Sequence, residues 1–257
     1  MGGALAGAVI KKYKATVWAS NPKKPHLAIS NEEKKLFKWT VDNSEVVKNV
    51  DIIFLAVKPA VMSQVLLNIK PLLKPNQIII SIAAGIPLLS LKKWSGAHKK
   101  IVRVMPNLPL LVMEGMCVWL ATKGLTKDEK KTIKNLLSSF GKEIEVKKEN
   151  LIDVATAVSG GGPAHTAAFL QCLFSSAKNM GFSKDHAHLL AIQTVLGSLK
   201  YIIETKADFE TLKTQVQTKG GTTEAAYKIL NRKKWQQTFE SALLAAYERA
   251  REISEKS

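Results

Sequence analysis

The first half of the chain alternates short apolar runs with segments of helical periodicity. Six runs rich in β-branched residues predict strands, at residues 15–20, 51–57, 77–83, 101–105, 116–121 and 143–146. Several of these runs are apolar without alternation, which is typical of strands buried on both faces of a mostly parallel sheet. Helical segments such as the one after Pro59 separate the runs, so the pattern predicts a doubly wound α/β sheet.

After about residue 150 the chain shows helical periodicity only. Five helices are expected, at residues 163–180, 184–204, 208–217, 223–231 and 233–254. In the last of them an apolar residue recurs at every fourth position from Trp235 to Tyr247, which predicts a stripe packed in a core or a subunit interface. We therefore expect an α/β domain at residues 1–149 and a helical domain at residues 150–257.

Helix caps support these assignments. Thr126 and Glu129 form a capping box, which predicts a helix that ends at Gly141. Ser183 and Asp208 precede two of the later helices and are expected to cap them.

Composition and charge narrow the class of protein. Of 257 residues, 46% are apolar and 23% are charged, which suits a soluble globular protein and excludes a disordered, collagen-like or disulfide-stapled chain. The 38 Lys and Arg against 21 Asp and Glu give a net charge of +17. Nearly all the cations are lysines spread along the chain, whereas base readout and bidentate phosphate contacts favour arginine. We interpret the charge as a solvated surface that also favours a phosphate-bearing ligand, and we expect no nucleic acid as partner.

The two cysteines and the longest apolar stretch point to a reducing compartment. Cys117 and Cys172 are far apart in apolar surroundings and form no CxxC pair, so we expect reduced, buried thiols. No metal-ligand spacing is present, and no metal is expected. The stretch 78–91 is interrupted by Gly85 and Pro87 and is too short to span a bilayer. We therefore expect a cytoplasmic protein without a membrane partner.

Unusual residues follow the first predicted strand. It ends in Ser20-Asn21-Pro22-Lys23-Lys24, where a fold that binds NAD normally places an acidic residue for the ribose hydroxyls. Hydroxyl, amide and ammonium groups suit a 2′-phosphate, which favours NADPH and leaves NADH as the alternative. An ordinary Asn-Pro turn with solvated lysines explains the same residues.

Three further strand ends carry small or turn-forming residues. They are Lys58-Pro59, Ala83-Ala84-Gly85 and Met105-Pro106-Asn107. A tight turn explains each one alone. Together, because the carboxyl ends of parallel strands meet at one edge of a sheet, they outline a ligand-binding cleft in which small residues let a flat ring or a phosphate approach the backbone.

Two glycine-rich segments precede helices in the second half, at residues 159–163 and 219–223. Each exposes backbone N–H groups at the positive end of a helix dipole, which suits a carboxylate or a phosphate. Simple helix-entry turns are the alternative. His165 follows the first segment, but no carboxylate lies near it in the sequence to orient it as a base. The absence of a catalytic dyad suits hydride transfer to a protonated imine, which depends on positioning more than on proton abstraction.

Taken together, the motifs AVKP, SIAAG, RVMPN, SGGGPA, GGTT and AIQTVLGSLK resemble the pyrroline-5-carboxylate reductase family over nearly the whole chain. The resemblance implies a Rossmann-like domain followed by an all-helical dimerisation domain. It implies a homodimer, or a larger ring of dimers. It also implies reduction of 1-pyrroline-5-carboxylate to L-proline with NADPH or NADH.

The resemblance also assigns residues. The positions that match cofactor contacts are Gly2, Ser20, Asn21, Lys23, Asn43, Ala56, Lys58, Pro59, Ala83, Ala84, Met105, Pro106 and Asn107. Those that match catalytic positions around the substrate are Ser159, Thr222 and Thr223, and those that match substrate-binding positions are Gly160, Gly162, Gly220, Gly221 and Thr166. In that family the second glycine loop reaches the site from the dimer partner.

The chain departs from the family pattern at its start. Residues 1–5 match only the end of the family's first loop, so the first strand of the Rossmann-like domain is apparently missing. A misassigned start and a lost cofactor cradle are the two explanations. The second would make the chain a cofactor-impaired paralogue that acts as an oligomeric small-acid binder.

Further departures lie in the glycine loops. Gly161 stands where the family has Ser, His165 where it has Tyr, and Lys219 where it has Pro. Ala168 stands where some relatives carry a Thr that bonds the substrate nitrogen. A β-hydroxyacid dehydrogenase is a further alternative, but it needs a lysine after the first glycine turn, where this chain has residues 166–169 without one.

Overall fold

The computed structural model describes residues 1–27 and 29–255. Its contacts divide the chain into two units. Unit 1 is Met1–Gly161 together with the chain from Ala246 onward, and unit 2 is Gly162–Ala245. The division therefore falls inside the first glycine-rich segment. The boundary between an α/β domain at residues 1–149 and a helical domain at residues 150–257 stays a prediction.

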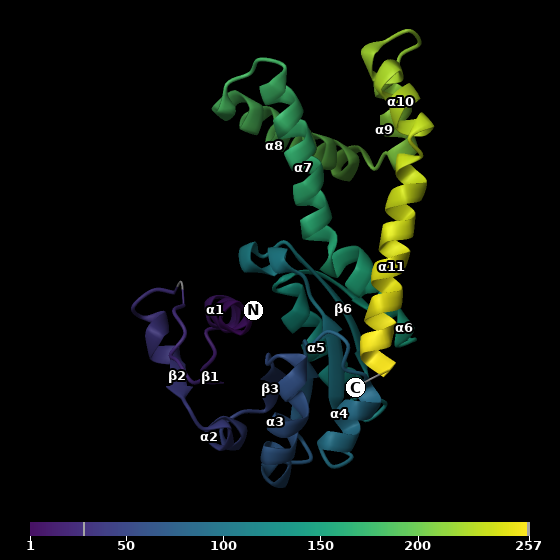
Figure 1. The fold of residues 1–257 in the computed structure, drawn as a ribbon. Helices are drawn as coiled ribbons and strands as arrows, with labels where there is room; N and C mark the ends of the chain where they lie inside the picture. Colours follow the sequence, from purple (N-terminus) through teal and green to yellow (C-terminus); the bar gives the residue numbers. More distant parts are fainter. Residues whose placement is uncertain (28, 256–257) are drawn as a thin grey trace. The chain divides into compact units, whose positions relative to one another are not determined.

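A five-stranded sheet forms the centre of unit 1 (Figure 1). In sheet order its strands are β3 (Ile52–Leu55), β4 (Ile78–Ser81), β5 (Ile101–Met105), β6 (Gly115–Ala121) and β7 (Gly141–Glu145). All neighbours are parallel except β5 and β6, which are antiparallel. Every residue of β4 is buried, as its unbroken apolar run predicts.

A separate two-stranded parallel sheet pairs β1 (Val17–Ser20) with β2 (Phe37–Thr40). Strand β1 confirms the first predicted strand in a shorter form. Strand β2 was not expected, because its four residues FKWT include two exposed ones and give no apolar run. A strand this short carries too little pattern to separate it from a loop.

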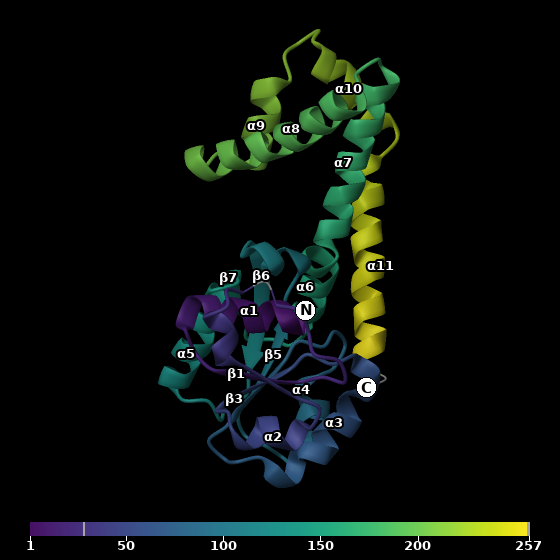
Figure 2. The same ribbon diagram turned by 90° about the vertical axis from the view of Figure 1, so that its left-hand side faces the viewer.

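Helices cover both faces of the larger sheet, so the predicted doubly wound arrangement is confirmed. On one face α1 (Gly2–Tyr13) and α5 (Lys127–Ser138) share a core with β4, β5 and β6; Figure 2 shows α1 lying across the sheet. The opposite face packs against α2 (Asn43–Lys48), α3 (Met62–Ile69) and α4 (Leu88–Trp94). Helix α6 (Asn150–Ala155) packs on β6. Short turns of 3-10 helix lie at η1 (Glu33–Leu36), η2 (Pro59–Val61), η3 (Lys70–Leu72) and η4 (Leu108–Val112).

The capping box of α5 is present as predicted. The Thr126 hydroxyl accepts from the Glu129 N–H at 3.2 Å, and the Glu129 carboxylate accepts from the Thr126 N–H at 2.9 Å. The expected end at Gly141 is wrong, because α5 ends at Ser138 and Gly141 begins β7 with a φ of 138°. That backbone conformation needs a glycine for a reason unrelated to the helix.

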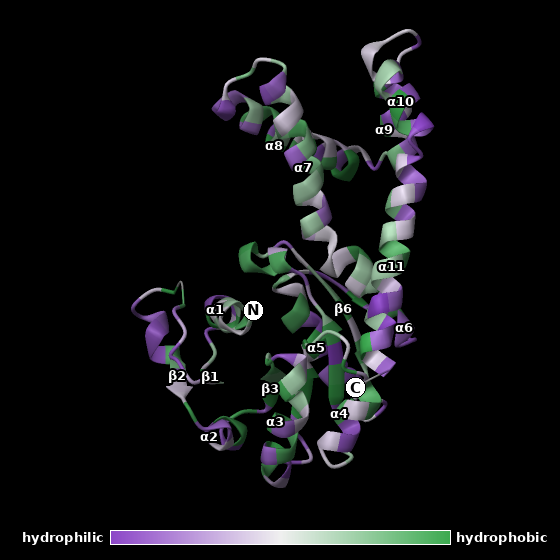
Figure 3. Cartoon of the chain, in the orientation of Figure 1, coloured by the Kyte–Doolittle hydropathy of each residue, from purple (hydrophilic) through white to green (hydrophobic). Residues whose placement is uncertain are grey.

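Unit 2 is made of helices only in its described residues. They are α7 (Gly162–Asn179), α8 (Lys184–Thr205), α9 (Phe209–Val216), α10 (Thr222–Arg232) and the larger part of α11 (Trp235–Glu255). The five predicted helices and the caps Ser183 and Asp208 are confirmed. Hydrophobic residues lie along these helices (Figure 3), yet among the described residues of the unit only Ala187 and Ala191 are buried. Trp235 and Phe239 are exposed, so their stripe forms no core within one chain.

Candidate active site

The N-terminus of α1 lies at the carboxyl end of β3. A Cβ built on Gly2 would be 3.2 Å from the Cβ of Ala56, so these two predicted cofactor positions are neighbours. The first turn of α1 contains no acidic residue, and no side chain caps it. Backbone N–H groups at the positive end of a 12-residue helix favour an anion at this edge of the sheet.

The segment after β1 is exposed and shaped by Asn21. Its side-chain amide donates to the Lys23 carbonyl at 2.6 Å, and the Trp39 indole donates to the Asn21 carbonyl at 3.1 Å. These bonds form the Asn-Pro turn weighed above and leave Ser20 and Lys23 at its two ends. The turn and the phosphate interpretation are compatible, since neither the Ser20 hydroxyl nor the Lys23 ammonium takes part in those two bonds.

Asn43 and Lys58-Pro59 lie at the starts of helical elements. Asn43 is the first residue of α2, whose cap is the adjacent Asp42, and the Ser44 N–H bonded to its carboxylate lowers the pKa of Asp42. Pro59 begins η2 directly after Lys58, as its lack of an N–H predicts. Lys58 and Pro59 are exposed, whereas Asn43 is partly buried.

The turn after β4 corrects one interpretation. Ala83 is buried and directs its N–H toward the Ser81 hydroxyl at 3.4 Å. Gly85 has a φ of 73°, and a Cβ there would overlap Ile253 of α11. The space beside Gly85 is therefore filled by a helix of the same unit and is not open to a flat ring. Ala84 remains a predicted cofactor contact.

Ser159 and Gly160 lie on a turn that the sequence did not predict. Residues Thr156–Gly160 form a π-helical turn, η5, between α6 and α7, and α7 begins at Gly162. Such turns are frequent at functional sites because they change which backbone groups are bonded. The Ser159 hydroxyl is partly exposed and donates to the Ala155 carbonyl at 2.9 Å.

The predicted nicotinamide contacts meet this turn. The Asn107 side-chain amide donates to the Ser159 carbonyl at 3.1 Å, and its oxygen accepts from the Met116 N–H at 2.8 Å. The Met105 methyl packs against Gly160, 2.5 Å from where a Cβ would be. The structure thus brings together, within unit 1, two groups of residues that are about 50 positions apart in the sequence.

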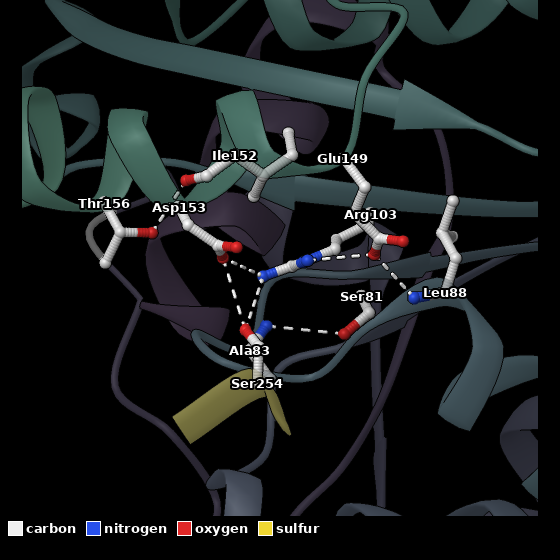
Figure 4. A network of polar contacts seen from close by, with 9 residues as sticks. All are labelled: Ser81, Ala83, Leu88, Arg103, Glu149, Ile152, Asp153, Thr156 and Ser254. Atoms are coloured by element: carbon white, nitrogen blue, oxygen red, sulfur yellow. Dashed lines mark hydrogen bonds and ion pairs between the residues drawn. The ribbon is translucent and has the colours of Figure 1, made fainter. Parts of the chain in front are cut away.

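A buried arginine anchors the start of α6, as Figure 4 shows. Arg103 of β5 is 1% exposed and donates to Glu149 at 2.9 Å and to Asp153 at 2.8 Å. Ser254 of α11 donates to the same Asp153 oxygen at 3.2 Å, and the Leu88 N–H donates to Glu149 at 2.7 Å. Sequence reasoning missed this network, although one signal was available: a single arginine inside the buried run IVRVM demands paired carboxylates.

The second glycine loop belongs to unit 2. Gly220 has a φ of 76° and donates its N–H to Glu224 at 2.7 Å, so this N–H is already engaged. Gly221 caps α10, and Thr222 and Thr223 form its first turn. The loop is therefore a helix entry, and the predicted carboxylate contacts lie at the positive end of that helix.

Two further predictions concern the start of α7. A Cβ built on Gly162 would meet nothing within 4 Å, so this position is open. The Thr166 hydroxyl is exposed and donates to the Gly162 carbonyl at 3.0 Å. The His165 ring packs edge-on against Phe239 at 5.5 Å between centroids, which agrees with a packing role.

The cysteines differ from each other. Cys117 is buried, and burial, helped by the negative charge of Glu143, raises its pKa to about 11. The expectation that Cys172 is buried is wrong for the single chain, because it is exposed on a unit-2 helix that lacks a covering layer.

In residues 1–27 and 29–255, no group of three His, Cys, Asp or Glu side chains is placed to hold a metal ion. No helix in that part of the chain is long and apolar enough to cross a membrane.

Comparison with known families gives two matches. Residues 149–253 match the family model described as pyrroline-5-carboxylate reductase dimerisation. Residues 1–85 match the model described as NADP oxidoreductase, coenzyme F420-dependent. The first match covers the helical part of the chain, and the second covers the first 85 residues of the α/β part.

Individual relatives agree with this. The chain is 36% identical to pyrroline-5-carboxylate reductase of Pseudomonas aeruginosa over 83% of this chain and 78% of that protein. It is 33% identical to the Escherichia coli enzyme over 100% and 94%. The Plasmodium falciparum pyrroline carboxylate reductase with NADP bound superposes with a TM-score of 0.89 and 31% identity, covering 99% of this chain and 94% of that one. The Coxiella burnetii enzyme gives 0.86 and 30%, covering 98% and 94%.

Proposed function

The chain belongs to the pyrroline-5-carboxylate reductase family, and we propose that it reduces 1-pyrroline-5-carboxylate to L-proline, the last step of proline biosynthesis. Within the molecule, the observation that carries the proposal is the bond between Asn107 and Ser159. It holds the predicted nicotinamide contacts beside the hydroxyl predicted to bind the substrate. A reaction between a cofactor and a small acid requires this proximity.

The residues at the sheet edge fit a phosphorylated dinucleotide. The glycine start of α1 lies against Ala56 and presents backbone N–H groups to a phosphate. Ser20 and Lys23 offer a hydroxyl and an ammonium group, and residues 21–31 contain no Asp or Glu that would repel a 2′-phosphate. NADPH is therefore the proposed cofactor, and when bound it supplies the hydride that the imine carbon accepts.

The chain's own residues are proposed to bind and orient the substrate. The Ser159 hydroxyl, on the π turn, donates to the Ala155 carbonyl in the chain without substrate, and it is proposed to turn this single proton to the substrate carboxylate on binding. Thr222 and Thr223, in the first turn of α10, are proposed to hold a carboxylate with their hydroxyl and backbone donors. No side chain is assigned as a base, because the substrate imine already carries its proton and the reaction needs alignment above all.

We propose that the protein works as a homodimer, with a larger ring of dimers as the finer form of this proposal. The family match to a dimerisation model over 149–253 and the scarcity of buried residues in unit 2 support a second copy as partner. A cytoplasmic location is proposed from the use of cysteine, since both thiols are free.

The deciding experiment is NADPH oxidation by the purified chain with and without 1-pyrroline-5-carboxylate, together with detection of proline. Substrate-dependent oxidation with stoichiometric proline is expected. Binding of substrate without turnover would instead favour the oligomeric small-acid binder. Oxidation of a β-hydroxyacid would favour the dehydrogenase alternative.

Paired variants extend this assay to the site. Ser159→Ala and Thr222→Ala are each expected to raise the substrate KM more than the NADPH KM. When the two variant proteins are dissociated and mixed, a site built from two chains would regain one intact copy in each hybrid dimer. Recovered activity is therefore expected, whereas a site built within one chain would leave every copy impaired.

A further inference from the structure

We propose that Asn107 is a positioning residue that holds Ser159 in place for the substrate, an inference that rests on the function proposed for that serine. The family resemblance assigns Asn107 to the cofactor. The contacts of its side chain point instead to the backbone of the π turn Thr156–Gly160, which carries Ser159. Asn107 lies two residues after the end of β5 and is the cap of η4, the 3-10 turn that leads to β6.

A hydrogen bond from the Met116 N–H fixes the orientation of the Asn107 side-chain amide. Its oxygen accepts from the Met116 N–H at 2.8 Å, and Met116 is held in β6 by the sheet. Because the amide has one acceptor end and one donor end, its NH₂ group must then face the other way. There it meets the Ser159 carbonyl at 3.1 Å.

The Ser159 carbonyl needs such a donor. In a continuous α-helix it would accept from the N–H four residues later, which is position 163. That residue is Pro163, which has no N–H. The π turn adds to the interruption, since the Gly161 N–H bonds five residues back to Thr156. Asn107 therefore satisfies a carbonyl that the loop's own sequence leaves without its helical donor.

Packing leaves the loop little freedom once this bond is made. The Met105 methyl packs against Gly160, 2.5 Å from where a Cβ would be, so a larger residue there would displace the Met105 side chain. The Ser159 hydroxyl is directed back to the Ala155 carbonyl at 2.9 Å, so its position follows that of the turn. Met105 and Asn107 thus contact two adjacent residues of the turn, Gly160 and Ser159, and a shift of the turn would move the hydroxyl with it.

Two variants test the role. Asn107→Asp keeps the size of the side chain and its acceptor for the Met116 N–H, but a carboxylate cannot donate to Ser159. Asn107→Ala removes both bonds without adding charge. Both are expected to raise the KM for 1-pyrroline-5-carboxylate by up to about 10-fold, the limit set by losing the one hydrogen bond that holds the turn, and to change the NADPH KM less than about 2-fold. Backbone amide exchange in residues 156–162 is expected to accelerate in both.

Leu110→Ala is the matched control. Leu110 is buried in the same 3-10 turn, so its truncation leaves a cavity and lowers the melting temperature. Its side chain has no bond to Ser159, so an unchanged substrate KM is expected. Adding Ser159→Ala to Asn107→Ala should raise the substrate KM no further than Ser159→Ala alone, because both act through one hydroxyl.

The outcomes separate this inference from the proposed function. Equal changes in both KM values, or a change confined to NADPH, would return Asn107 to the cofactor and overturn the inference. Unchanged exchange at residues 156–162 would overturn it as well. An inactive parent chain would defeat the proposed function, while the exchange measurement would still decide whether Asn107 holds the loop.

Discussion

Unit 1 and unit 2 use similar proportions of apolar sequence in different ways. Of the apolar residues buried in the described chain, all but Ala187 and Ala191 lie in unit 1, where helices close over both faces of a sheet. In unit 2 the helices form with their caps, yet none of the large apolar side chains in its described residues is buried. The difference shows that an apolar pattern specifies an element but leaves open what covers it.

Helix α8 makes this point within one element. Leu189, Ile192, Leu196, Leu199 and Ile203 follow one another at alternating spacings of three and four residues. All of them are exposed, the last by 73%. A stripe at this spacing is the pattern of a helix seam that packs against another helix. We therefore expect unit 1 to be stable by itself and unit 2 to depend on a second copy.

The largest expected effect is on unit 1. Arg103→Met leaves the largely buried carboxylate of Asp153 without its cation, which should lower the free energy of unfolding by about 3–5 kcal/mol. Calorimetry at several protein concentrations is the measurement, and the loss should not depend on concentration. Arg232→Met, at an exposed arginine of unit 2, is the control and should change little. Equal effects of the two substitutions would mean that the buried network does not stabilise unit 1.

The second effect is on association. Leu196→Glu places a charge in the middle of the α8 stripe and should raise the dimer Kd by about 100-fold or more. Sedimentation velocity over a dilution series measures this. Gln193→Glu adds the same charge on the same helix outside the stripe and should leave the Kd nearly unchanged. Indistinguishable dissociation of the two variants would show that the stripe is not the seam.

The smallest expected effect is on the free energy of unfolding and comes from the capping box at the start of α5. Hydrogen bonds from Lys100 and from the Thr126 backbone lower the pKa of Glu129. The stabilisation of the folded state by this carboxylate is therefore complete above the ordinary glutamate pKa, and it disappears as the pH falls through the lowered pKa of the folded state. Glu129→Gln should therefore cost less than about 1 kcal/mol at pH 7, and the difference from the parent should shrink in acid below about pH 4. Urea unfolding across this range is the measurement. Asp128→Asn, which leaves the capping box intact, serves as the control, and a pH-independent difference for Glu129→Gln would contradict the assignment.

The accuracy of the sequence predictions follows how local each signal is. Strand β4 and the capping box of α5 were predictable because burial on two faces and capping both leave their mark on adjacent residues. Strand β2 was missed because four residues with two exposed positions carry no such mark. The π turn at Thr156–Gly160 was missed for another reason: a glycine run reads as a helix start, and the shift in backbone bonding leaves no pattern of its own.

The sequence by itself determined most of the element types, the N-terminal caps of α5, α8 and α9, the motif set and through it the family, because periodicity, capping and motif spacing are properties of neighbouring residues. Only the tertiary structure decided three other matters. Ile253 packs against Gly85, Arg103 pairs with carboxylates 46 and 50 residues away, and the Asn107 amide donates to the Ser159 carbonyl. The physical reason is the same each time: these contacts satisfy steric and hydrogen-bonding requirements across elements that are distant in the chain, and no single segment encodes its partner.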